Sequence, residues 1–72
     1  MRAEPSQHID ISVVITAHAE GRLAHRTMRS VHVAISEANA HGVQSEIIVV
    51  LDSPTAETLA YFATWRDRAR II

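Results

Sequence analysis

The sequence predicts an α/β fold in which parallel strands alternate with helices along the chain. Two apolar runs, I-D-I-S-V-V-I-T at residues 9–16 and E-I-I-V-V-L at residues 46–51, are typical of strands buried on both faces. A long amphipathic segment follows each run, and residues 70–72 indicate the opening of a third strand. The order β-α-β-α-(β) favours one parallel sheet with right-handed crossovers and helices packed on its faces.

The first helix is predicted from about Arg22 to His41. Small and apolar residues recur along it at spacings of four and three, which places them on one face. Gly42 suits the left-handed conformation in which many helices end. The residues expected on the buried face are Ala24, Met28, Val31, Ile35 and Ala38.

The second helix is predicted to follow the turn at residues 52–55 and to run to about Asp67. Ser53 is expected to cap the free amides, with Pro54 at the first helical position. The residues expected to be buried are Leu59, Phe62 and Trp65, which we interpret as core or interface residues.

Composition limits the classes of function. The 72 residues are 47% hydrophobic and have a formal net charge of −1, which favours a globular domain and argues against a nucleic-acid partner. The chain has no Cys, and its apolar runs are too short to cross a bilayer. We expect residues 1–8 to be a flexible lead without signal-peptide character and residues 9–72 to be a partial domain, in a cytoplasmic protein.

Length predicts that the domain is incomplete on its own. A chain of 72 residues buries only about 60% of its unfolded surface, and this one has no disulfide to compensate. We therefore expect a homo-oligomer, or a segment of a larger protein.

Polar residues follow both predicted strands. Thr16, His18 and Glu20 come at or after the end of the first strand, and Asp52 and Ser53 come directly after the second. Because the carboxyl ends of neighbouring parallel strands meet at one edge of the sheet, we expect both groups there, where such folds bind ligands. The alternative is that Asp52 and Ser53 only cap the second helix.

Three segments carry a resemblance to a known family. They are I-S-V-V-I-T-A-H-A-E-G, then R-T-M-R-S-V, then E-I-I-V-V-L-D-S-P-T. In this order they resemble the amino-terminal part of family 2 glycosyltransferases, which have V-S-V-I-I-P-T-Y-N-E, an R-T-L-x-S-V-like helix and E-I-I-V-V-D-D-G-S-T-D. The resemblance covers about residues 10–65. It implies a Rossmann-like, nucleotide-binding sheet of the GT-A type.

The resemblance implies a nucleotide-sugar donor linked to UDP, GDP or dTDP. Thr16 matches the position at the end of strand one that lines the nucleotide pocket, and His18 the Tyr or His position beside the base. Glu20 matches the acidic residue of the N-E pair. Asp52 matches the residue that reads the nucleobase, and Ser53 lies in the turn that follows.

The chain also departs from the family pattern. Ala19 replaces the usual Asn, Leu51 replaces the first Asp of the D-D pair, and Pro54 reshapes the turn. No D-x-D motif or catalytic base is present, so we assign no catalytic residue and no cofactor to this chain, and expect it to be inactive alone. The complete enzyme is expected to use Mg²⁺ or Mn²⁺.

Histidines and arginines give weaker signals. The five His lack the compact spacing of metal ligands, so we expect solvated or interfacial roles and no metal site. Arg22, Arg26 and Arg29 fall early in the first helix and form either a solvated face or a phosphate-attracting group.

The alternative to a nucleotide-binding segment is a small self-associating α/β module without a ligand. The apolar edge at residues 71–72 would then pair with another copy, or the copies would exchange elements.

Overall fold

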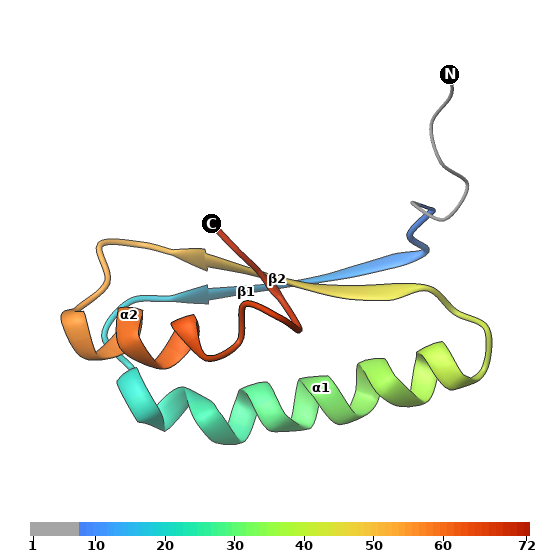
Figure 1. The fold of residues 1–72 in the computed structure, drawn as a ribbon, viewed down its shortest axis with the longest axis horizontal. Coiled ribbons are helices and arrows are strands. Elements are labelled where there is room, and N and C mark those ends of the chain that lie inside the picture. Colours follow the sequence, from blue (N-terminus) through green and yellow to red (C-terminus); the bar gives the residue numbers. More distant parts are fainter. Residues whose placement is uncertain (1–7) are drawn as a thin grey trace.

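The computed structural model describes residues 8–72 and has an α/β fold with a three-stranded parallel sheet and two helices (Figure 1). The expected flexible lead lies outside the described residues, apart from His8. Along the chain the elements are β1 (Ile11–Ala17), the 3₁₀ turn η2 (Gly21–Ala24), α1 (His25–Ala40), β2 (Ser45–Leu51), α2 (Ala56–Ala63) and β3 (Arg70–Ile71).

The sheet has the order β1-β2-β3, with every neighbouring pair parallel. Ile11 lies opposite Ser45 and Ala17 opposite Leu51, so β1 and β2 end together. The predicted third strand is confirmed, because β3 pairs with β2 and the Ile72 N–H donates to the Val49 carbonyl at 2.8 Å.

The helices cover one face of the sheet only. Both lie on the same side of the strands (Figure 1), and Met28 of α1 and Phe62 of α2 share one buried cluster with Ile47 and Val49. On the other face Val14 is 60% exposed. The prediction that the strands are buried on both faces is therefore wrong. Each successive strand is added on the same side of the one before it, which gives the order β1-β2-β3. Two crossovers with the same handedness therefore place both helices on the same face of the sheet.

The predicted buried face of the first helix is confirmed. Met28 is fully buried, and the other four positions are half-buried. On α2, Phe62 and Trp65 join the core as expected, but Leu59 is 47% exposed, contrary to the prediction.

The start of the first helix differs from the prediction. Residues 21–24 form the 3₁₀ turn η2, in which the Leu23 N–H donates to the Glu20 carbonyl at 3.0 Å, and α1 begins at His25. At its other end the expected left-handed residue is confirmed, with a φ of 87° at Gly42.

The second helix also has different bounds. Ser53 has a φ of 46° and is not the cap; Thr55 is, and its side chain accepts from the Thr58 N–H at 3.2 Å. Pro54 therefore precedes the helix instead of opening it. The helix ends at Ala63 and not near Asp67, because hydrogen-bonded turns replace it from Thr64 onward.

One buried hydrogen bond fastens α2 to the loop after β1. The Gly21 N–H donates to Oγ1 of Thr58 at 2.9 Å, and Thr58 is fully buried. Gly21 has a φ of 54°, and a Cβ at this position would lie 2.6 Å from Cδ of Glu57. The positive φ favours glycine here, and a side chain would also displace the exposed Glu57 side chain.

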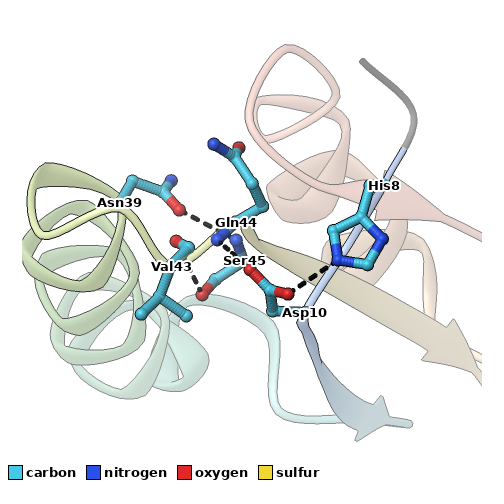
Figure 2. Close-up of polar contacts among 6 residues, drawn as sticks. All are labelled: His8, Asp10, Asn39, Val43, Gln44 and Ser45. Atoms are coloured by element: carbon cyan, nitrogen blue, oxygen red, sulfur yellow. Dashed lines mark hydrogen bonds and ion pairs between the residues drawn. The ribbon is translucent and has the colours of Figure 1, made fainter. Parts of the chain in front are cut away.

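Polar contacts around Asp10 hold together the amino-terminal ends of β1 and β2, at the end of the sheet opposite Gly21 (Figure 2). Its Oδ2 accepts from the Gln44 N–H at 2.9 Å and its Oδ1 lies 2.8 Å from Nε2 of His8. Both hydrogen bonds lower the pKa of Asp10, the one from Gln44 more strongly. Asn39 accepts from the Ser45 N–H at 2.8 Å, so the starts of β1 and β2 are tied to the end of α1.

We predict that Gly21→Ala lowers the free energy of unfolding by about 1 kcal/mol, because the positive φ is costly for alanine while the exposed Glu57 side chain can turn away from the new methyl group. The matched control is Gly42→Ala, where φ is also positive but no atom lies within 4 Å of the new Cβ. It should cost about the same, about 1 kcal/mol. Urea denaturation measures both, and a much larger loss for Gly21→Ala than for Gly42→Ala would contradict this account.

Candidate functional site

The carboxyl ends of β1 and β2 lie side by side, as the sequence predicts. Their last residues, Ala17 and Leu51, are partners in the parallel ladder. The Asp52 N–H donates to the Ala17 carbonyl at 2.8 Å, and the Thr55 N–H donates to the His18 carbonyl at 3.2 Å. The two loops therefore form one connected edge, to which α2 is also attached.

At this edge the imidazole of His18 contacts the backbone of Asp52. Nδ1 of His18 lies 2.7 Å from the Asp52 carbonyl oxygen. A carbonyl oxygen accepts hydrogen bonds and cannot donate them, so Nδ1 carries a proton. In the neutral tautomer Nε2 is then unprotonated, and it is available to accept a hydrogen bond from a ligand.

Glu20 holds the loop after β1 in its conformation. Its Oε1 accepts from the His18 backbone N–H at 2.6 Å. This hydrogen bond is the main cause of the lowered pKa of Glu20, since it stabilises the ionised carboxylate. Glu20 therefore positions His18, although its carboxylate is solvent-exposed.

Asp52 presents its carboxylate to solvent. Within residues 8–72 no hydrogen bond or ion pair engages that carboxylate, although the backbone of Asp52 is held on both sides. Ser53 follows with its φ of 46°, a conformation that non-glycine residues seldom adopt and that recurs at ligand sites. A carboxylate on an anchored backbone suits hydrogen-bond donors such as an imide N–H or ribose hydroxyls.

Thr16 lies apart from the other predicted residues. Successive strand residues point to opposite faces, and its neighbour Ala17 is in the core, so Thr16 points to the open face of the sheet. Its partner in the ladder is Val50. The structure thus groups His18, Glu20 and Asp52 at the edge, followed by Ser53, while Thr16 borders the edge from the uncovered face.

A hollow of about 710 Å³, which was not predicted from the sequence, opens between the start of α1 and α2. Its lining contains Glu20 from the predicted site and Arg22 from the predicted arginine group, together with His25, Glu57 and Tyr61.

An aromatic hydrogen-bond chain supports this hollow. Nδ1 of His25 lies 2.9 Å from the Tyr61 hydroxyl, which accepts from Nε1–H of Trp65 at 2.8 Å. The contact between Tyr61 and Trp65 could have been predicted from the sequence, because residues four apart on a helix are neighbours. Their contact with His25 could not, because it depends on how the helices pack.

Two of the histidines contact aromatic side chains within the chain. His25 contacts Tyr61, and the His32 ring packs edge-on against Trp65 with 5.7 Å between centroids. Across the part of the chain that the structure describes, no group of three or more His, Asp or Glu is placed to hold a metal ion. In the same residues no helix has both the length and the apolar character needed to cross a membrane.

No protein-family model, curated protein or solved structure matches this chain.

We predict that the His18 backbone amide reports the ionisation of Glu20. The folded-state pKa of Glu20 is depressed, so the stabilising hydrogen bond is present at neutral pH and is lost as the pH falls through that lowered pKa. The amide proton of His18 should therefore shift with an inflection below the ordinary pKa of a glutamate side chain. Glu20→Gln keeps an acceptor oxygen and should abolish the inflection in an NMR pH titration; persistence of the inflection in this variant would contradict the assignment.

Proposed function

We propose that this chain is the nucleotide-recognition part of a glycosyltransferase that uses a nucleotide-sugar donor. The parallel β1-β2-β3 sheet with its helices would be a portion of a Rossmann-like domain of the GT-A type. The observation that carries the proposal is the coupled edge at His18 and Asp52, where an unengaged carboxylate and a free imidazole nitrogen lie on one anchored pair of loops.

The chemistry of the edge suits a nucleoside. The Asp52 carboxylate would accept from the imide N–H of a pyrimidine base or from ribose hydroxyls, in charge-assisted hydrogen bonds. Nε2 of His18 would accept from a second hydroxyl. Glu20 would act on the ligand through His18, because its carboxylate is engaged with the backbone of that residue. Thr16 and Ser53 would border the ligand.

Group transfer needs more than this edge supplies. A diphosphate leaving group requires a divalent cation or an equivalent positive group, and an acceptor hydroxyl requires a base. The sequence has no D-x-D motif, so we propose recognition without catalysis for these residues. In the complete enzyme the cation would be Mg²⁺ or Mn²⁺, and the reaction would take place in the cytoplasm.

The test is an NMR titration of the isotope-labelled chain with UDP, GDP and dTDP. We expect millimolar binding of at least one of these, with shifts at Thr16, His18 and Asp52. Asp52→Asn should weaken binding about ten-fold, the equivalent of about 1.4 kcal/mol for a lost charge-assisted hydrogen bond.

The matched control is Asp67→Asn, which removes the same charge from the turn that precedes β3, where the exposed carboxylate lies 3.3 Å from Nε of Arg68. It should leave binding unchanged. Equal weakening by both substitutions, or no shift at the three residues, would refute recognition at this edge.

A second candidate function is self-association, and the uncovered face of the sheet favours it. Val14 is 60% and Ile72 65% exposed, and half-buried Ile48 and Val50 lie between them. We propose that a second copy of the chain covers this face.

Light scattering tests this proposal, with an expected mass of two chains or more. Val14→Lys should reduce that mass to one chain, since it places a charge in the apolar patch. The control is Leu59→Lys on the helical side, also an exposed apolar position, which should preserve the assembly. A single-chain mass for the unmodified protein would exclude this function.

A further inference from the structure

The outward face of α1 has positive charges in an arrangement that destabilises the helix. Arg26 lies in the first turn of α1, where the helix dipole disfavours positive charge; Arg22 precedes it in η2, and Arg29 follows one turn later. Their spacings of four and three place like charges next to each other, and the first turn has no acidic residue. Such a departure from local preference is expected where a surface has a function.

The three guanidinium groups form no ion pair. All are solvent-exposed, and among the described residues none of them has an ion pair or a side-chain hydrogen bond. The acidic residue of α1, Glu37, lies two turns beyond Arg29 and is 3.6 Å from His41. Glu20 and Glu57 line a hollow with Arg22, so Arg26 and Arg29 are the two positive charges of this face without a nearby acidic residue on the helix.

Two exposed apolar side chains flank the arginines. Leu23 is 85% and Val33 61% exposed, and both line the same shallow hollow of about 870 Å³ as the three Arg and Ser30. They are ten residues apart, which is about 15 Å along a helix. Figure 1 shows α1 as an outer layer that runs along one face of the sheet, so its far side is away from the strands.

We propose that this face of η2 and α1, defined by Arg22, Leu23, Arg26, Arg29 and Val33, binds an anionic lipid surface. The arginines would contact the headgroups, and Leu23 would insert beside them. Lipid binding at this face does not depend on nucleotide binding at the His18–Asp52 edge, so the two proposals are tested separately.

The pattern favours a lipid surface over two other occupants. A second copy would bring three Arg and one Glu to each side of the interface, so the like charges would dominate. An acidic helix needs closely spaced apolar anchors, three or four residues apart, and Ser30 and Arg26 separate the two apolar side chains here. A fluid surface accepts each apolar side chain separately.

The test is co-sedimentation of the full chain with vesicles of phosphatidylcholine and phosphatidylserine in a ratio of seven to three. We expect binding in low-salt buffer, weaker binding at physiological salt, and none to vesicles of phosphatidylcholine alone. Arg26→Gln should reduce the partition coefficient about five-fold, and Leu23→Ala should reduce it several-fold without changing the charge.

The matched control is Arg66→Gln, which removes one exposed positive charge from the turn after α2. It should leave the partition coefficient unchanged. Circular dichroism confirms that each variant is folded, which is expected because all three positions are exposed. Three results would overturn the proposal: no binding to the anionic vesicles in low salt, an equal effect of Arg66→Gln and Arg26→Gln, or binding to an acidic amphipathic peptide with none to vesicles.

Discussion

The arrangement of the carboxyl edge depends on the buried hydrogen bond from the Gly21 N–H to Oγ1 of Thr58. This contact joins the loop after β1 to the first turn of α2. The hydroxyl oxygens of Thr58 and Thr55 lie 2.8 Å apart, and the Thr55 N–H donates to the carbonyl of His18. The chain of contacts thus runs from the buried Thr58 to His18 at the carboxyl edge. Because Thr58 is fully buried, an unpaired hydroxyl or amide there would cost about 1–3 kcal/mol.

Much of the fold follows from periodicity. Apolar runs separated by amphipathic segments predict the order of elements, the parallel sheet and the third strand, and the 3.6-residue period predicts the face of α1 around Met28. The uncovered face of the sheet was not predictable, because β-branched residues such as Val14 and Val50 look the same whether a helix covers them or not. Which face is covered depends on the direction in which successive strands are added, and periodicity does not contain that information.

Local chemistry explains the errors at α2. Ser53 and Thr55 are both good capping residues, so the sequence alone did not decide between them. The left-handed conformation of Ser53 and the extended backbone of Thr55 do decide, and they follow from the contact with His18. In the same way, the proximity of His18 and Asp52 was predictable from parallel pairing. The roles of the Asp52 carbonyl and the Glu20 carboxylate were not, because they involve backbone groups whose partners appear only in the folded chain.

We infer that the Gly21–Thr58 hydrogen bond holds the two loops of the carboxyl edge as one rigid unit. Amide hydrogen exchange of the Gly21 N–H measures this most directly, because a buried and bonded amide exchanges only when the local structure opens. We expect protection of the Gly21 amide similar to that of Val49 in β2, and loss of that protection in Thr58→Val. Fast exchange of the Gly21 amide in the unmodified chain, with Val49 still protected, would contradict this inference.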